Sequence, residues 1–152
     1  MRRTDKQVTD PARIRAIVDG CDCCRLGLCD AGVAYIVPMS FGYTEQDGQY
    51  TFFFHSAREG RKQTLLRQSP RIGFELDTNH CMRVESHSCT YSSVIGVGTV
   101  SFLTDPAEKA AGLRAILRHC IGRDDLPLTE AQLSAVCVFS LTVESLSCKE
   151  SL

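Results

Sequence analysis

The 152-residue sequence lacks an excess of charge of either sign and lacks a long apolar run. Lys and Arg number 17 and Asp and Glu 18, giving a net charge of -1. We therefore expect no general attraction to nucleic acid or to an anionic membrane, and any anion site must be local. No apolar run approaches the roughly 20 residues that span a bilayer. Polar residues follow Met1 without the apolar core of a secretory signal, so we expect a cytoplasmic protein.

Internal repeats, low-complexity tracts and long linkers are also lacking. A chain of 152 residues fits one domain, whose single core can bury enough apolar surface without staples. We therefore expect residues 1–152 to form a single domain.

Cysteine, in contrast, is abundant, with nine residues. Without a secretory signal, free thiols or a metal site are more plausible than a disulfide framework. The thiols gather in two places, Cys21 to Cys29 and His80 to Cys89. Their spacing does not match the paired motifs of zinc sites, so we predict no metal site. A Cys/His metal-binding module stays open as an alternative.

Hydrophobic periodicity and turn residues predict about seven strands and two or three helices. The expected strands are 25–29, 33–43, 50–55, 71–76, one near 82–85, 91–103 and 135–146; the expected helices are 11–18, 57–68 and 107–120, with a short turn of helix at 129–133. Strands joined by tight turns must be antiparallel. Many strands with few helices favour a barrel over a doubly wound sheet.

Several residues predict local features of these elements. Pro38 cannot donate to a strand ladder, so it marks an edge, a bulge or a break. Gly96 and Gly98, within one strand, indicate a bulge or a close approach. Ser56 and Glu59 have the spacing of a capping box at the start of a helix.

The most informative segment is residues 54–62, where an aromatic strand leads into a helix that begins with two cations. A helix N-terminus presents unpaired N–H groups and a partial positive charge. Ser56 adds a hydroxyl, Arg61 can bind a phosphate in a bidentate manner, and Lys62 adds a point charge. The segment therefore predicts a phosphate site. The alternative is an ordinary capped helix with a solvated basic face.

This segment resembles the FMN-phosphate segment of the pyridoxamine 5'-phosphate oxidase-like split-barrel superfamily. The closer similarity is to the nitroimidazole-resistance (Nim) branch. It is carried, in order, by Arg25–Leu28, Tyr35–Tyr43, His55-x-Ala57-x-x-Gly60-x-Lys62, Tyr91–Gly98 and Asp105–Lys109.

The resemblance implies a mainly β (α+β) fold, an antiparallel Greek-key split β-barrel with two or three flanking helices. It also implies a homodimer with FMN in each interface cleft. The implied cofactor-binding residues are Val37, Pro38, Met39, Ser40, Phe54, His55, Ser56, Arg61, Lys62, Ser92 and Ser93, with the two later serines reaching the cofactor from the partner subunit. His55 lines the active site in this branch and is the one candidate catalytic residue; otherwise it is a strand-end histidine bonded to backbone.

No carboxylate pair or Ser-His-Asp set stands out in the sequence, which suits a protein whose cofactor carries the chemistry. We therefore expect an FMN-dependent oxidoreductase, similar to nitroimidazole reductases, that acts on a small molecule. The alternatives are a non-catalytic protein that binds flavin, deazaflavin F420 or haem in the same barrel, and the metal-binding module.

Overall fold

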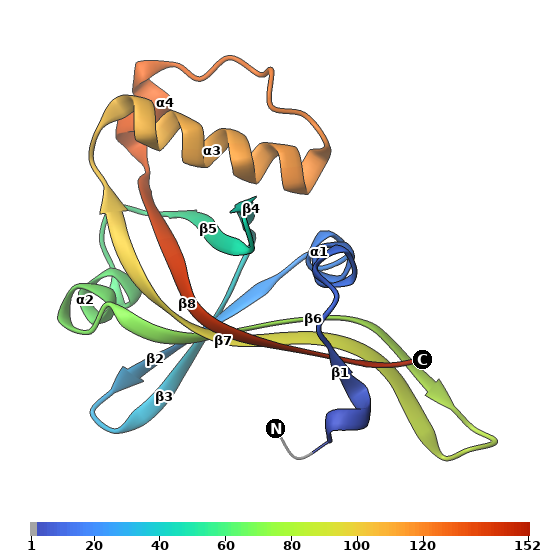
Figure 1. Cartoon of the computed structure of the whole chain (residues 1–152). Helices are drawn as coiled ribbons and strands as arrows, with labels where there is room; N and C mark the ends of the chain where they lie inside the picture. Colours follow the sequence, from blue (N-terminus) through green and yellow to red (C-terminus); the bar gives the residue numbers. More distant parts are fainter. Residues whose placement is uncertain (1–2) are drawn as a thin grey trace.

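A computed structural model describes residues 3–152 (Figure 1). Its elements, in chain order, are a 3-10 turn at Thr4–Lys6, β1 (Gln7–Val8), α1 (Pro11–Asp19), β2 (Cys24–Asp30), β3 (Val33–Met39), β4 (Gly42–Gln46), β5 (Gln49–Ser56), α2 (Arg61–Gln68), β6 (Arg71–Arg83), β7 (Ser88–Leu103), α3 (Pro106–Ile121), α4 (Glu130–Ala135) and β8 (Cys137–Ser151). None of the helices within residues 3–152 is long and apolar enough to cross a membrane.

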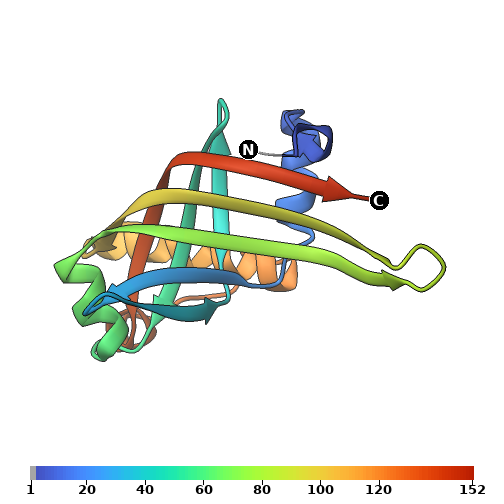
Figure 2. The ribbon, with the colours of Figure 1, turned by 90° about the horizontal axis from the view of Figure 1, so that it is seen from below.

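The strands form one antiparallel sheet in the order β3-β2-β6-β7-β8-β5-β4, and β1 pairs with β8. Because β3 and β4 do not pair with each other, the barrel is split. Figure 2 shows β6, β7 and β8 as long strands side by side, with β4 and β5 running across them at a steep angle. The predicted fold class, a mainly antiparallel split barrel with flanking helices, is confirmed.

The core lies inside this curved sheet and is rich in aromatic side chains. Side chains alternate along β5, so that Phe52 and Phe54 are fully buried. The Phe54 and Phe139 rings stack with centroids 5.3 Å apart, and Phe52 contacts Phe74 at the same centroid distance. The first contact joins β5 to its neighbour β8, and the second joins β5 to β6 across the core.

Two glycines in β7 have the roles that the sequence predicts. The register between β7 and β8 shifts between Val97 and Gly98, which is a bulge. A Cβ on Gly96 would overlap the Phe74 ring and the Ser145 carbonyl, so this backbone makes a close approach. The bulge increases local twist and helps β8 to bend.

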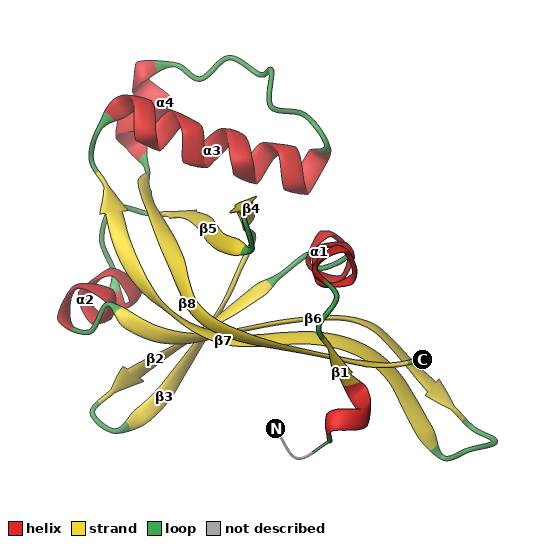
Figure 3. Cartoon of the chain, in the orientation of Figure 1, coloured by secondary structure: helices red, strands yellow, loops and turns green. Residues whose placement is uncertain are grey.

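The helices lie outside the strands (Figure 3). The side chains of Asp10 and Asp105 accept hydrogen bonds from the first turns of α1 and α3, each of which begins with proline. α3 ends at Gly122, which has a φ of 71°. α3 then packs over β4 and β5, where Gly42 allows the two backbones to approach closely.

Several element boundaries differ from the prediction. The expected strand at 33–43 is two strands, and the break falls at residues 40–41 rather than at Pro38. Pro38 instead lies within β3, at the edge of the sheet where a missing donor is tolerated. β6 runs without a break to Arg83 and absorbs the strand expected near 82–85, and β8 continues to Ser151 because it pairs there with β7.

The predicted capping box at the start of α2 is wrong. α2 begins at Arg61, and its N-cap is Gly60 with a φ of 142°, without a side-chain cap. Ser56 still belongs to β5, where it pairs with Cys137. The hydroxyl is therefore held by the strand, and the loop at residues 57–60 separates it from the helix.

Candidate functional site

The predicted phosphate site lies where α2 begins beside the end of β3. Lys62 is half-buried, and its ammonium group lies 2.9 Å from the Met39 thioether sulfur. No carboxylate within residues 3–152 forms an ion pair with Lys62. Burial lowers the pKa of Lys62 from its ordinary value. A buried charge without a counter-charge is costly, so this position favours an anion.

Arg61 faces the same side but is engaged within the chain. Its guanidinium bonds Asp30 on β2, with Nε 2.7 Å from Oδ2, and lies over the Tyr35 ring at 4.3 Å from the centroid. Arg61 is exposed, so the pair contributes little stability. An incoming phosphate would therefore share Arg61 with Asp30 rather than find it free.

Ser56 is linked to the helix through Gln63, which the sequence reasoning missed. The Gln63 amide is buried and donates to the Ser56 hydroxyl at 2.5 Å and to the Ala57 carbonyl at 2.7 Å. These bonds hold the loop at residues 57–60 against α2. A glutamine three positions after Gly60 was the available signal, since Gln at the third helical position commonly bonds back to the preceding turn.

The backbone N–H groups of Arg61, Lys62 and Gln63 have no partner within the helix, whose first bond runs from the Thr64 N–H to the Gly60 carbonyl. These donors and the Lys62 ammonium come from the same turn. Together they make a small, locally positive site suited to a phosphate group.

The four predicted residues of β3 and its end lie beside this site, in the chain's edge strand. Met39 is buried and contacts Lys62, while Val37 is half-buried and Pro38 and Ser40 are exposed. Within residues 3–152, β3 pairs only with β2, so one edge of its backbone is free to bond a ligand or another chain.

Phe54 and His55 have different environments. The Phe54 side chain is fully buried in the core, and only its backbone reaches the end of β5. His55 is exposed and pairs in register with Val138. Side chains alternate along the strand, so His55 points away from the core, on the same face of β5 as Phe53.

Ser92 and Ser93 lie far from α2 within one chain. Gly98 of β7 pairs with Ile72, which follows α2 closely in the chain. Ser92 is six residues before Gly98 in the same strand, so the two residues are about 20 Å apart. Ser92 is buried and donates to Glu150 at 2.8 Å. The structure thus does not bring the serines together with Lys62 in a single subunit.

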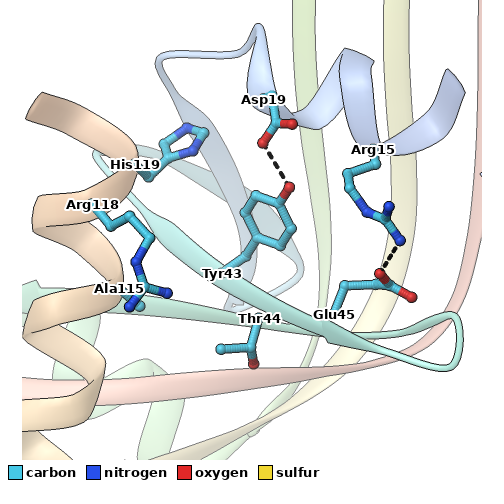
Figure 4. Close-up of a pocket in the computed structure, with 8 residues that line it drawn as sticks. All are labelled: Arg15, Asp19, Tyr43, Thr44, Glu45, Ala115, Arg118 and His119. Atoms are coloured by element: carbon cyan, nitrogen blue, oxygen red, sulfur yellow. Dashed lines mark hydrogen bonds and ion pairs between the residues drawn. The ribbon is translucent and has the colours of Figure 1, made fainter. Parts of the chain in front are cut away.

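A separate polar hollow of about 530 Å³ lies between α1, β4 and α3 (Figure 4). Several of its polar groups already have partners: the Tyr43 hydroxyl donates to Asp19 at 2.6 Å, and Arg15 pairs with Glu45. Burial, followed by the Asp19 carboxylate, raises the pKa of Tyr43. None of the predicted site residues lines this hollow.

The thiols do not converge. Within residues 3–152, no three His, Cys, Asp or Glu side chains are placed to hold a metal ion. Cys21, Cys24 and Cys148 are buried in the core, and all nine cysteines are free.

Comparison with known proteins gives a family match. The family model described as pyridoxamine 5'-phosphate oxidase matches residues 10–150. A solved structure from Bacteroides thetaiotaomicron, of a protein to which 5-nitroimidazole antibiotic resistance is attributed, is 28% identical over 95% of this chain and 86% of its own, with a TM-score of 0.83. A search of curated proteins gave no match.

Two further structures share the fold. The flavocytochrome Anf3 from Azotobacter vinelandii is 22% identical over all of this chain and 72% of its own, and the FAD- and haem-binding protein from Mycobacterium smegmatis is 19% identical over 96% and 73%. Both have a TM-score of 0.78. At these identities the likeness concerns the fold alone.

Proposed function

The chain belongs to the pyridoxamine 5'-phosphate oxidase family, in the branch that resembles nitroimidazole-resistance proteins, and on that premise we propose that it is a flavoprotein that binds FMN. The proposed activity is oxidoreduction of a small molecule. The proteins that share the fold include FAD-binding and haem-binding members, which supports a redox cofactor of this general kind.

The observation that carries the proposal is the uncompensated Lys62 ammonium at the start of α2. A phosphate dianion would neutralise Lys62 and accept hydrogen bonds from the first N–H groups of the helix. Arg61, already oriented by Asp30 and the Tyr35 ring, adds a second cation. Ser56 is held within the same unit through Gln63.

The remaining residues are assigned around the flavin ring. The free edge of β3, from Val37 to Ser40, supplies backbone donors and acceptors for its polar rim. When bound, FMN supplies one- or two-electron chemistry that no side chain here can perform. His55, exposed at the end of β5, is the proposed group beside the substrate, where an imidazole can hold or donate a proton.

A homodimer is part of the proposal, with Ser92 and Ser93 reaching the cofactor of the partner subunit. The outer face of β3, β2, β6 and β7 supports an interface. Here Ile36, Gly27, Gly73 and Val97 form one cross-strand row, and Ile36 and Ile95 are each 55% exposed. A Cβ at Gly27 or Gly73 would meet nothing closer than 3.6 Å. The fold of one chain therefore does not require these glycines, and they leave a flat apolar surface.

The phosphate assignment is tested by titrating Lys62→Gln with FMN and with riboflavin, which lacks the phosphate. We expect the Kd for FMN to rise at least about tenfold, a loss of about 1.4 kcal/mol, and the Kd for riboflavin to stay the same. Flavin fluorescence quenching measures both. Arg58→Gln, an exposed cation in the adjacent loop, is the matched control and should bind both ligands as the wild type does.

Equal weakening of FMN and riboflavin would mean that Lys62 acts only through folding, and an unchanged FMN affinity would remove the phosphate site. The visible spectrum of the purified protein separates flavin from haem and deazaflavin. Stopped-flow reduction by NAD(P)H, followed by reoxidation with a nitroaromatic compound, tests turnover. His55→Gln should slow the reoxidation by the nitroaromatic compound.

A further inference from the structure

The β6–β7 hairpin extends beyond the rest of the sheet as an arm (Figure 1) and carries a second group of reactive side chains. Asp77, His80 and Cys89 lie along it, with Asp77 toward the sheet and Cys89 one pair from the turn. Residues that pair directly across antiparallel strands share a face. Asp77 therefore shares a face with its partner Ser93. Cys89 lies four residues from Ser93 on β7, so the thiol points to the same, outer side as the carboxylate.

The three side chains form a chain of contacts. His80 Nε2 lies 3.0 Å from Asp77 Oδ2, and His80 Nδ1 lies 3.7 Å from Cys89 Sγ. The imidazole ring also stacks on Tyr91, with centroids 6.2 Å apart and planes inclined by 27°. The ring is thus held on one face and at both nitrogens, which limits its rotation.

This order of groups is that of an activated nucleophile. Asp77, which also pairs with Arg25, accepts a hydrogen bond from the Nε2–H of His80 in this arrangement. Nδ1 then presents a lone pair to the thiol. The Cys89 sulfur has a second acceptor, the Thr90 carbonyl at 3.1 Å, but a carbonyl cannot take the proton. His80 is the base in this arrangement, and Asp77 orients it.

The other cysteines provide a contrast. Burial raises the pKa of Cys21 to about 12 and that of Cys148 to about 11, which keeps them as unreactive thiols. Cys81 is exposed on the same arm and pairs with Thr90, so it faces the opposite side of the hairpin from Cys89. Within residues 3–152, no histidine is a hydrogen-bond partner of the Cys81 thiol, which bonds the Met82 carbonyl instead.

We propose that Cys89 is a nucleophilic thiol, activated by His80 and positioned by Asp77, that reacts with small-molecule disulfides. The Cys89 proton passes to His80 Nδ1, and the sulfur forms a bond to one sulfur of the disulfide. The disulfide bond breaks, and its electron pair leaves on the second sulfur, which takes the proton from His80. One disulfide is exchanged for another, so no external oxidant is needed.

The site shares no residue with the proposed flavin site, although Asp77 pairs with Ser93, so the experiment follows the thiol directly and needs no flavin. The experiment uses the full chain and 5,5'-dithiobis(2-nitrobenzoate), an aromatic disulfide whose released thiolate is coloured. Trypsin places the two arm cysteines on separate peptides, residues 72–83 with Cys81 alone and residues 84–109 with Cys89 alone. Quenched time points analysed by mass spectrometry therefore give a rate for each cysteine in the same sample.

We expect Cys89 to react at least about tenfold faster than Cys81, a conservative figure for a positioned base. His80→Gln should remove this advantage while the Cys81 rate stays the same. Asp77→Asn should reduce it in part, again without effect on Cys81. The Cys81 rate is thus an internal control for opening of the arm.

Equal rates for Cys89 and Cys81 in the wild type would overturn the proposal. It would also fail if His80→Gln left the ratio of the two rates unchanged, or if both rates changed together, since the imidazole would then act only on the structure of the arm.

Discussion

Gly42 determines how closely β4 and α3 can approach. A Cβ at this position would overlap the Ala115 carbonyl and the Ile116 N–H of α3. Both neighbours are backbone atoms, so no side-chain rotation can relieve the overlap. The spacing between this helix and the sheet therefore depends on a single absent methyl group.

We predict that Gly42→Ala lowers the free energy of unfolding by about 1–3 kcal/mol, the usual cost of overpacking a close contact. Gly20→Ala is the control, because a Cβ there has no neighbour closer than 3.5 Å and the φ is negative. It should leave stability unchanged or raise it by up to about 1 kcal/mol. Urea unfolding followed by circular dichroism measures both. Equal effects of the two substitutions would argue against the close contact.

Single residues were predictable from the sequence where their role is local. The position of Lys62 in the first turn of a helix was predictable, and so were the bulge and the close approach at Gly98 and Gly96. The Asp30 partner of Arg61 was not predictable, because it depends on how the β2–β3 hairpin folds against α2. The same is true of the contact between Asp77, His80 and Cys89, which exists only in one register of the arm.

At the scale of elements, α1 and α3 were predictable because each begins with an Asp-Pro pair that caps and starts the helix by itself. α2 was misplaced because the Ser56 hydroxyl has a tertiary partner in Gln63, and local capping rules cannot see that partner. The ends of β6 and β8 were also missed, since a strand continues for as long as its neighbour pairs with it.

The outer face of β3, β2, β6 and β7 gives a prediction about assembly. We expect Ile36→Glu to convert the proposed homodimer to a monomer, because it places a charge in the centre of an apolar interface. Val84→Glu is the matched control, since Val84 is 73% exposed in the arm and lies away from this face. Sedimentation velocity measures the mass of each. A wild-type protein that sediments only as a monomer would contradict the interface itself.

At the scale of the whole molecule, the buried thiols determine how stability changes at high pH. Burial raises the pKa of Cys21 and Cys148 above the ordinary value of 9.0, and it raises that of Cys24 further still. The folded state therefore holds these protons more tightly than the unfolded chain does. Their contribution is fully present below about pH 9 and is lost as the pH rises from there toward 11 or 12.

We predict that the free energy of unfolding falls by about 1 kcal/mol for each buried thiol between about pH 9 and pH 10. Urea unfolding in the presence of a reducing agent measures this slope. Cys148→Ala should lower stability at every pH but flatten the slope. A slope that is the same in the mutant and the wild type would mean that other groups control the alkaline transition.

The topology of the sheet also determines when it can assemble. β8 pairs with β7, β5 and β1, so it is the strand that joins the two halves of the barrel. It is also synthesised after all its partners. The elements from β1 to α4 therefore leave the ribosome before β5 and β7 can cover their open edges with β8. Until then those edges are sites for chaperone binding or misassociation. Emergence of β8, rather than of any earlier hairpin, is the step that commits this chain to its native barrel.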